Sequence, residues 1–289
     1  MKGVSSCKMS YRSKITKVPV GEVIPDNEIW YVTEIRISYE DYLTSLQGIE
    51  FFSKLYNLEV RCCERLTSVN LSDNINLKTI TLHQCDLLQS LDVSMLHDLT
   101  KLDCGLCYSL SKLDISKYAK LTYLDYGHSK LRDFDFTMYN KLTYLNCAKT
   151  ITTSNLDVSM LPYLTELDCG LNNLGNQGMV NLLKTCPQLK VLHCYNNNIS
   201  SLDVSVLPEL TELDCSYNNL GNQGMADIVK SCPKLKFLDC DNTNLSSLDL
   251  STLSLTNLRC YSNNLSSLNI STQQNLVELN CHKPKFRST

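Results

Sequence analysis

A nine-residue phrase, Leu-x-x-Leu-x-Cys-x-x-Asn, recurs along this chain and constrains its fold more than any other feature. Its first leucine is position 1 of a unit that we call a rung, and it stands at residues 55, 77, 99, 121, 142, 164, 189, 210, 235, 255 and 276. A degenerate copy begins at Val32. The alternation of apolar and variable residues at positions 3 to 7 predicts a short strand with one buried face. Because no single rung can bury its apolar side alone, the repetition predicts a stacked parallel solenoid of about twelve rungs.

A second apolar pair follows each strand, in phrases such as L-D-V-S, whose Asp and Ser favour a tight turn. Two rungs are longer, and their residues 172–189 and 218–235 carry apolar side chains at the spacing i, i+3, i+4, i+7. We expect an α-helix in each of these two rungs. The expected N-caps are Asn176 and Asn222, and the expected terminators are Pro187 and Pro233.

Two stretches of this sequence are typical of a known family. They are the repeated phrase L-T-E-L-D-C-S-x-N-x-L-S-S-L-D-V-S and the segment L-T-S-L-Q-G-I-E-F-F-S-K-L at residues 43–55. Both resemble the bacterial internalins, which are leucine-rich repeat proteins whose repeats carry a cysteine ladder. The two longer rungs resemble ribonuclease-inhibitor-type repeats.

The resemblance implies an α/β fold, namely a right-handed leucine-rich repeat solenoid with a parallel β-sheet on its concave face. Short turns or 3-10 turns and two α-helices would form the convex face. We expect an N-terminal tail and cap at residues 1–31, the solenoid at residues 32–284 and a C-terminal tail at residues 285–289.

Charge and hydropathy narrow the classes of partner and location. The formal net charge is -3 and the pI is near 6.0, so no overall basic footprint favours nucleic acid. No run approaches the roughly eighteen apolar residues of a membrane span, so we expect no membrane insertion. The first twenty residues lack the apolar core of a signal peptide. The sequence leaves two locations open: the cytoplasm, or the cell surface or exterior if a leader is missing from this chain.

The 15 cysteines are explained mostly by their spacing. Other rungs hold Val60, Leu82 and Tyr126 at position 6, so we expect thiols at this position to pack inward as small apolar groups. Eight cysteines occupy this position: Cys104, Cys147, Cys169, Cys194, Cys215, Cys240, Cys260 and Cys281. We expect reduced thiols, because parallel in-register rungs hold Cβ atoms farther apart than the roughly 3.8 Å that a disulfide needs.

Three more cysteines, Cys63, Cys85 and Cys107, occupy position 9, where other rungs have an asparagine that closes the turn. A metal site could be assembled from these three with Cys104 and Cys62. The interpretation is weak, because the single C-x-x-C pair has no second pair and Cys104 is expected in the core.

Catalytic and calcium-binding interpretations are also weak. His193 precedes Cys194 directly, but neighbouring strand residues face opposite sides of a sheet, so a Cys-His dyad is not expected. Asp214, Asp239 and Asp241 could approach a calcium ion, yet calcium needs six to eight oxygen ligands, and a flat sheet offers few carbonyls. We therefore predict no enzyme activity, no metal site and no cofactor.

If the position-6 thiols point inward, then positions 3, 5 and 7 project from the concave face. These positions hold ten carboxylates against three basic side chains, together with aromatic residues over a floor of small ones, Gly105, Gly127, Ala148 and Gly170. Exposed aromatic side chains on rigid strands are typical of binding hot spots. The predicted partner-binding residues are Tyr123, Tyr144, Asp103, Asp125, Asp168, Val191, His193, Tyr195, Asp214, Phe237, Asp239 and Tyr261.

These patterns predict a non-enzymatic module, most simply a monomer, that binds a protein with a basic or polar patch through the concave face. The resemblance adds a bacterial surface or secreted protein of adhesion or host interaction. The alternatives are a cytosolic inhibitor-like or structural scaffold and a targeting domain of a larger protein. For the acidic residues, a competing interpretation is that aspartate at position 5 belongs to the repeat's consensus and only keeps the sheet soluble.

Overall fold

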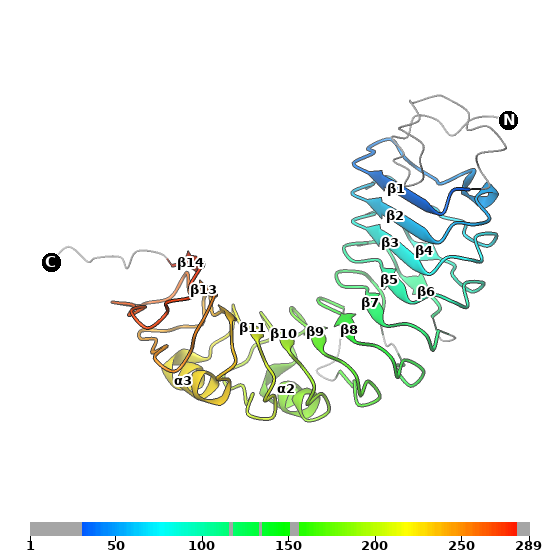
Figure 1. Cartoon of the computed structure of the whole chain (residues 1–289). Helices are drawn as coiled ribbons and strands as arrows, with labels where there is room; N and C mark the ends of the chain where they lie inside the picture. Colours follow the sequence, from blue (N-terminus) through cyan, green and yellow to red (C-terminus); the bar gives the residue numbers. More distant parts are fainter. Residues whose placement is uncertain (1–30, 116–117, 133–134, 151–155, 282–289) are drawn as a thin grey trace. The chain divides into compact units, whose positions relative to one another are not determined.

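The computed structural model describes residues 31–115, 118–132, 135–150 and 156–281. The chain forms two compact units, residues 1–150 and 151–289, and each is described by itself. Figure 1 shows the strands of both units. The predicted N-terminal cap, apart from Tyr31, and the predicted C-terminal tail lie outside the described residues, so the proposed domain boundaries stay predictions.

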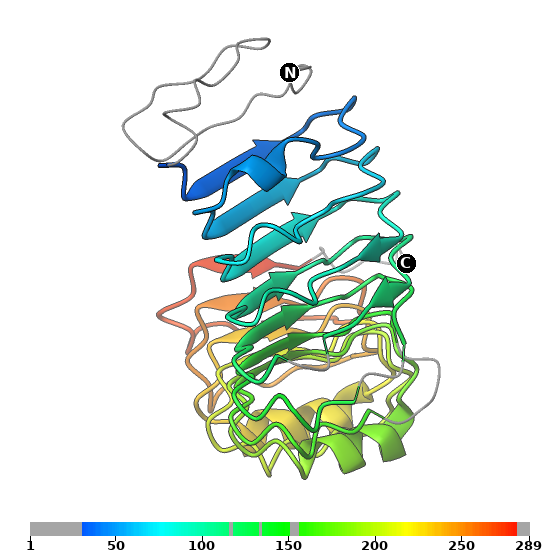
Figure 2. The same cartoon turned by 90° about the vertical axis from the view of Figure 1, so that its right-hand side faces the viewer.

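The first unit is a parallel sheet whose strands follow one another in chain order, one per rung (Figure 2). Each strand begins at position 3 of its rung, and equivalent positions pair, as Glu59 does with Thr81. This register confirms the stacked parallel solenoid that the repeat predicts. The strands are β1 (Glu34–Ser38), β2 (Asn57–Arg61), β3 (Thr79–His83), β5 (Lys101–Asp103), β7 (Tyr123–Asp125) and β8 (Tyr144–Asn146). A 3-10 helix (Ile49–Phe51) and a small second sheet of β4 (Ser90–Leu91) and β6 (Lys112–Leu113) complete the unit.

The second unit repeats this arrangement and adds two helices, α2 (Gly175–Leu183) and α3 (Gly221–Ser231). Figure 1 shows both helices on the side of the rungs opposite β10 and β11. They bury the apolar stripe that the sequence predicts: Met179, Leu182 and Leu183 in α2, and Met225, Ile228 and Val229 in α3. The strands are β9 (Glu166–Asp168), β10 (Val191–His193), β11 (Glu212–Asp214), β12 (Phe237–Asp239), β13 (Asn257–Arg259) and β14 (Glu278–Asn280).

The predicted N-caps of the two helices are wrong. Each helix begins two residues earlier than expected, at a glycine with positive φ, with a leucine at the N-cap position and no side-chain cap hydrogen bond. Asn176 and Asn222 lie inside the first turn and bond to the next rung instead. The Oδ1 atom of Asn176 accepts from the N–H groups of Ser200 and Ser201 at 2.8 and 3.1 Å.

The predicted tight turns after the second apolar pair are confirmed. Where the structure describes the whole phrase, the side chain of its Asp or Asn accepts a hydrogen bond from the backbone N–H two residues later, which closes the turn locally. Asp92 accepts from Ser94 at 2.9 Å, and Asp203 accepts from Ser205 at 3.1 Å.

The core is made of the leucines at positions 1 and 4 and of the thiols at position 6. Cys104, Cys147, Cys169, Cys194, Cys215 and Cys240 are fully buried, and Cys260 nearly so, as free thiols. Burial raises the pKa of the Cys260 thiol to about 12 and that of Cys194 beyond the usual range. The expectation of an inward thiol is wrong only for Cys281, which is exposed, because its strand β14 is the last in the described sheet and no further described rung covers it.

In the described rungs from β1 to β13, a left-handed residue at position 8 turns the chain out of the main sheet. Its N–H still bonds to the next rung, as in the 2.9 Å bond from Leu106 N to Gly127 O. A left-handed conformation costs an L residue about 1–2 kcal/mol, so this inter-rung bond helps to offset the strain. The residues, with φ between 50° and 59°, are Tyr39, Cys62, Gln84, Leu106, His128, Lys149, Leu171, Asn196, Tyr217, Asn242 and Ser262.

The asparagine side chain at position 9 closes the turn by bonding to backbone groups, as predicted. The amide of Asn197 donates to the carbonyls of Cys169 and Cys194 at 2.9 and 3.1 Å, and its Oδ1 accepts from the N–H groups of Asn172 and Leu174. In three rungs of the first unit, the buried thiols of Cys63, Cys85 and Cys107 occupy this position. The Sγ of Cys107 donates to Leu82 O at 2.8 Å, and the pKa of Cys85 is raised by its contact with Cys107 and by burial.

Candidate protein-binding face

Positions 3, 5 and 7 form one face of each sheet, which we call the outer face. In β2, the residues at these positions are half-buried, whereas Leu58 and Val60 between them are fully buried. The predicted partner-binding residues therefore lie on the face that the alternation indicates. Whether they bind a partner stays a prediction.

Two tyrosines of the predicted site stack on the outer face of the first unit. Tyr123 and Tyr144 pair across β7 and β8, with ring centroids 4.0 Å apart and planes inclined by 3°. The ammonium of Lys101 lies 4.2 Å from the centroid of the Tyr123 ring, and burial raises the pKa of the Tyr123 hydroxyl to about 12. The rings are therefore held rigidly in place before any partner arrives.

The small residues at position 7 leave room for the position-5 side chains of neighbouring rungs. A Cβ atom at Gly105 would lie 2.7 Å from Asp125 Oδ1, and one at Gly127 would lie 2.6 Å from Asn146 Oδ1. Larger residues at these two positions would displace the position-5 side chains. The glycines at these positions therefore have a packing reason.

Asp103 and Asp125 are far less accessible than their outer-face position predicts, at 4% and 5% exposed. Their Oδ1 atoms accept from the N–H groups of Gly105 and Gly127 at 3.2 and 3.0 Å. Asp125 Oδ2 also accepts from the Asn146 amide at 3.1 Å. Burial, with the nearby charge of Asp103, raises the pKa of Asp125 to about 7.

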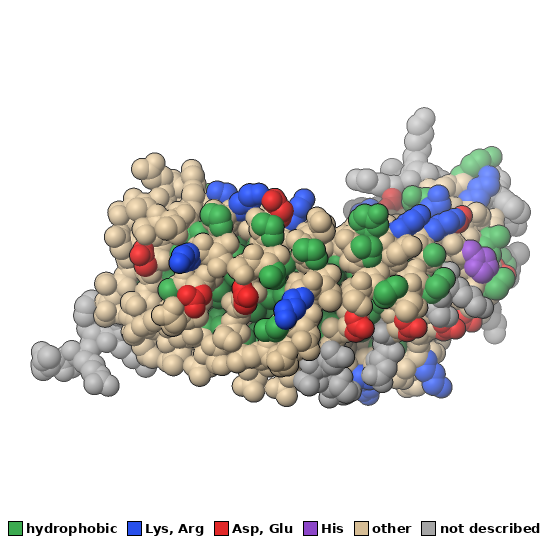
Figure 3. Space-filling model, turned by 90° about the horizontal axis from the view of Figure 1, so that it is seen from below, with side chains coloured by type: hydrophobic (Ala, Val, Ile, Leu, Met, Phe, Trp, Pro, Cys, Tyr) green, Lys and Arg blue, Asp and Glu red, His purple; other side chains and the backbone are tan. Residues whose placement is uncertain are grey.

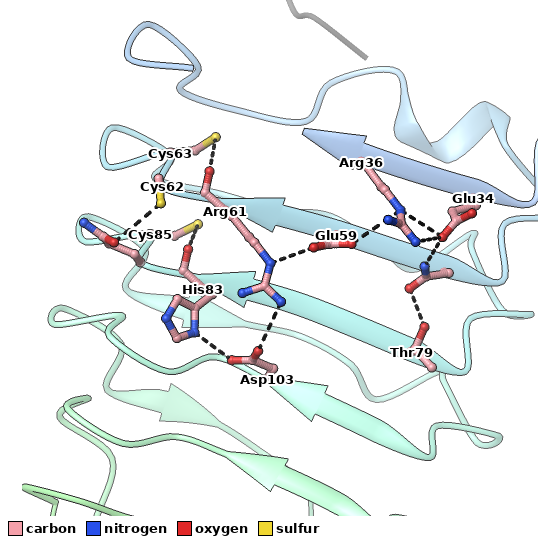
Figure 4. Close-up of polar contacts among 12 residues, drawn as sticks. Glu34, Arg36, Glu59, Arg61, Cys62, Cys63, Thr79, His83, Cys85 and Asp103 are labelled. Carbon is pink, nitrogen blue, oxygen red and sulfur yellow. Dashed lines mark hydrogen bonds and ion pairs between the residues drawn. The ribbon is translucent and has the colours of Figure 1, made fainter. Parts of the chain in front are cut away.

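A network of ion pairs lies on the same face, on the strands that precede the tyrosines (Figure 4). The sequence analysis did not predict this network. Arg36 contacts Glu59 at 3.4 Å, and Arg61 contacts Glu59 at 2.6 Å and Asp103 at 4.0 Å. His83 Nδ1 lies 3.1 Å from Asp103 Oδ1, which raises the pKa of His83. Opposite charges at alternate positions of adjacent strands are the signal that could have identified this network.

The acidic residues of the second unit show the same local bond as Asp125. Asp168, Asp214 and Asp239 each accept, at 3.0 Å, from the N–H two residues later. Burial raises the pKa of Asp239 to about 6 and also raises that of Asp168. The consensus interpretation thus has a physical basis, because this bond ties the end of each strand to the following turn.

His193 lies between two carboxylates on the outer face. Its Nε2 is 2.9 Å from Glu212 Oε1, and its Nδ1 is 3.9 Å from Asp168 Oδ2. The neighbouring Cys194 is fully buried in the core. The two side chains therefore lie on opposite sides of the sheet, as the strand alternation predicts, and form no dyad.

The second predicted aromatic patch is less continuous than the first. Along position 3, Glu212 stands between Val191 and Phe237 in the strand register. The Phe237 ring instead receives the Arg259 guanidinium, 5.5 Å from its centroid. Tyr195 lies over Gly170, where a Cβ atom would come within 2.3 Å of the ring. Tyr261 donates its N–H to Asp241 at 2.5 Å.

The acidic character of the outer face differs between the units. In the second unit, positions 3, 5 and 7 from β9 to β14 hold seven carboxylates and one arginine. In the first unit, the same positions from β1 to β8 hold four carboxylates, Glu34, Glu59, Asp103 and Asp125, nearly balanced by Arg36, Arg61 and Lys101. Figure 3 presents a different view, in which side chains of both charges are interspersed with apolar ones.

Within residues 31–115, 118–132, 135–150 and 156–281, no group of three or more His, Cys, Asp or Glu side chains is arranged to hold a metal ion. In the same ranges, neither helix has the length and apolar character needed to cross a bilayer.

Comparisons with known proteins agree with this architecture. A family model of leucine-rich repeats (two copies) matches residues 187–223, and the model of the endo-beta-N-acetylglucosaminidase EndoS leucine-rich repeat domain matches residues 28–118. No protein with a curated description matches the chain.

Among solved structures, the functional domain of InlJ from Listeria monocytogenes, described as including a cysteine ladder, is 30% identical with a TM-score of 0.67. That match covers 91% of this chain but 56% of the InlJ structure, so this chain spans little more than half of it. The internalin InlF from the same species is 21% identical with a TM-score of 0.62, covering 95% of this chain and 87% of that one. A leucine-rich repeat protein of Leptospira interrogans is 21% identical with a TM-score of 0.53, covering 83% and 75%. The chain therefore has a leucine-rich repeat fold and resembles the cysteine-ladder internalins.

Proposed function

We propose that this chain is a non-enzymatic module that binds a protein through the outer faces of its sheets. Repeat solenoids of this kind typically offer extended surfaces to macromolecular partners. The observation that carries the proposal is the stacked pair of Tyr123 and Tyr144, held against Lys101. Rigid aromatic side chains lose little conformational entropy on binding. Less of the free energy gained from their contacts is therefore offset by ordering, and binding is tighter.

The charge of the second unit indicates the kind of partner. Glu166 and Glu278 are exposed on the outer face, and Asp168, Asp214 and Asp241 are partly exposed beside them. A protein with a basic patch would be attracted to this surface and oriented by it.

The experiment compares the wild-type chain with the double variant Tyr123→Ala/Tyr144→Ala. Both are immobilised, exposed to a cell extract, and the retained proteins are identified by mass spectrometry and purified. We expect at least one purified protein to bind the wild-type chain and to bind the double variant with affinity lower by about 2–4 kcal/mol, as for hot-spot residues.

The matched control is Tyr163→Ala, since Tyr163 is 64% exposed and lies outside the outer-face positions. Its binding should equal that of the wild-type chain. Far-UV circular dichroism and the thermal midpoint establish that the double variant is folded. Equal binding of every purified protein to the wild-type chain and to the folded double variant contradicts the proposal.

A second candidate function is a targeting domain in a larger protein. The match of residues 28–118 to the leucine-rich repeat domain of EndoS favours it, because that domain is named as part of a glycosidase. The test is to read the coding sequence on both sides of this chain. An in-frame catalytic domain would support this candidate, and stop signals at both ends would contradict it.

A further inference from the structure

An uncharged hollow opens among the turns that follow β10, β11, β12 and β13 in the second unit. Its volume is about 430 Å³, and seven asparagines line it together with Tyr217 and Ser262. All nine lining residues are neutral. The hollow lies beside the outer face of the sheet and shares no residue with the predicted partner-binding set.

The asparagines come from three columns of equivalent positions, namely position 8, position 9, which supplies Asn218, and position 10. Position 8 supplies Asn196 and Asn242, and position 10 is asparagine in every rung from Asn173 to Asn264. The first unit holds Glu64, Asp86, Tyr108 and Lys130 at position 10, so the column belongs to the second unit alone among the rungs that the structure describes. A left-handed φ accounts for asparagine at positions such as 198 and 244, but Asn219 and Asn264 are not among the left-handed residues.

Most of these amides have unused hydrogen-bonding capacity. The side chains of Asn196, Asn198, Asn242 and Asn264 are exposed and make no hydrogen bond within the described part of the chain. Their backbones are nevertheless fixed, because the N–H of Asn196 donates to Ser216 O at 3.0 Å and that of Asn242 donates to Tyr261 O at 2.9 Å. The hollow therefore presents a rigid backbone with free amide groups.

Tyr217 is the aromatic residue among the asparagines that line the hollow. It occupies position 8, between Asn196 and Asn242 in rung order, and is 54% exposed. Its φ of 53° is strained for an aromatic residue, and the bond from its N–H to Asp241 O at 2.8 Å holds it there. Because the left-handed conformation recurs at position 8 of the other rungs, the feature that sets Tyr217 apart within this hollow is its exposed aromatic ring among amide side chains.

We propose that this hollow binds an uncharged oligosaccharide. Each amide offers both a donor and an acceptor, which match the adjacent hydroxyl groups of a sugar ring. The electron-rich face of Tyr217 can pack against the apolar C–H face of a pyranose. The neutral lining offers no ion pair to a charged ligand, and the volume falls within the roughly 300–1,000 Å³ of small-molecule sites.

The test screens the full chain against an array of short uncharged oligosaccharides and their sialylated and sulfated counterparts. The best uncharged sugar is then titrated by calorimetry at low and high salt. We expect Tyr217→Ala to weaken binding about tenfold or more, whereas Tyr217→Phe, which keeps the ring, should stay within about threefold of the wild type. Affinity should not depend on salt, because no charge pair is involved.

Tyr163→Ala is the control for loss of an exposed tyrosine elsewhere in the same unit, and its affinity should be unchanged. Asn242→Asp keeps the shape and the tolerance for a positive φ but removes the donors, and it should also weaken binding. Three results would overturn the proposal: no uncharged sugar binds at millimolar concentration, Tyr217→Ala binds as the wild type does, or charged sugars bind best with affinity that salt abolishes. The protein-binding proposal is tested separately, since Tyr123 and Tyr144 belong to the other unit.

Discussion

At position 5, an aspartate repeatedly accepts the backbone N–H of position 7 in its own rung, as Asp125 does from Gly127 and Asp168 from Gly170. The bond fixes the end of the strand just before the left-handed residue at position 8. These acids therefore have a structural role that does not require a partner. Their predicted role in binding depends on the part that each leaves exposed, which is small for Asp103 and Asp125 and larger for Asp168 and Asp214.

Burial raises the pKa of Asp125 to about 7, which makes stability depend on pH. Because the folded state holds the proton more tightly than the unfolded state, Asp125 stabilises the fold at pH 4, and this contribution is lost as pH rises through 7. We expect Asp125→Asn, which stays neutral, to raise stability at pH 8 relative to the wild type by about 1–3 kcal/mol. Urea denaturation at pH 5 and pH 8 measures the difference.

The exposed Asp73→Asn variant serves as the control for removing one carboxylate from the same unit. It should shift stability by less than about 0.5 kcal/mol at either pH. If Asp125→Asn and the wild type lose stability equally between pH 5 and pH 8, the carboxyl of Asp125 does not titrate in this range.

The buried asparagines at position 9 should dominate local stability. Asn197→Ala would leave two carbonyls and two N–H groups without their partner in the core, at a cost of about 2–4 kcal/mol. Asn275→Ala, at an exposed asparagine of the same unit, should cost less than about 1 kcal/mol. Chemical denaturation monitored by circular dichroism compares the two variants, and equal losses of stability would contradict the structural role of the position-9 asparagines.

The direction of each side chain at this scale was predictable from the sequence, but its exposure was not. Alternation along the strand placed Cys104 inward and Asp103 outward, and both placements hold. The burial of Asp125 depends on the missing side chain of Gly105 one rung away, which lets the carboxyl lie flat on the sheet. Such contacts join residues about twenty positions apart, so a pattern within one rung does not reveal them.

At the scale of elements, the spacing of apolar residues correctly predicted both helices, whereas the predicted N-cap residues were wrong. A polar residue before an apolar stripe is normally read as an N-cap, yet Asn176 and Asn222 bond to residues 24 and 25 positions later. Capping propensities reflect hydrogen bonds between a side chain and its own helix terminus. Here the asparagine side chains bond to backbone groups of the next rung instead.

This difference can be tested on α3. Asn222→Ala removes the acceptor of the N–H groups of Ser246 and Ser247, so these two amides should exchange hydrogen faster while the first turn of α3 is little affected. The cost in stability should be about 1–2 kcal/mol. Gln223→Ala, whose side chain bonds only within α3 to Asp227, is the control. Faster exchange in the first turn of α3 with unchanged Ser246 and Ser247 would restore the capping interpretation.

At the scale of the whole chain, the net charge of -3 conceals an uneven distribution, since the outer face of the second unit carries most of the acidic excess. A strip of one sign accelerates the approach of a partner of the opposite sign, and it does so through exposed charges. Glu166, Glu212 and Glu278 are the carboxylates at position 3 of this unit, and all three are at least partly exposed. They are better placed for steering than the buried Asp103 and Asp125.

We therefore expect the triple variant Glu166→Gln/Glu212→Gln/Glu278→Gln to bind the protein partner with an association rate roughly tenfold lower at low salt. The difference should disappear at about 0.5 M salt, where charges more than a few ångströms apart are screened. Asp103→Asn/Asp125→Asn, which removes two buried carboxylates, should leave the association rate unchanged. Surface plasmon resonance across a salt series measures these rates. An association rate that is insensitive to salt, or that falls more with the buried pair than with the exposed three, would mean that short-range contacts alone select the partner.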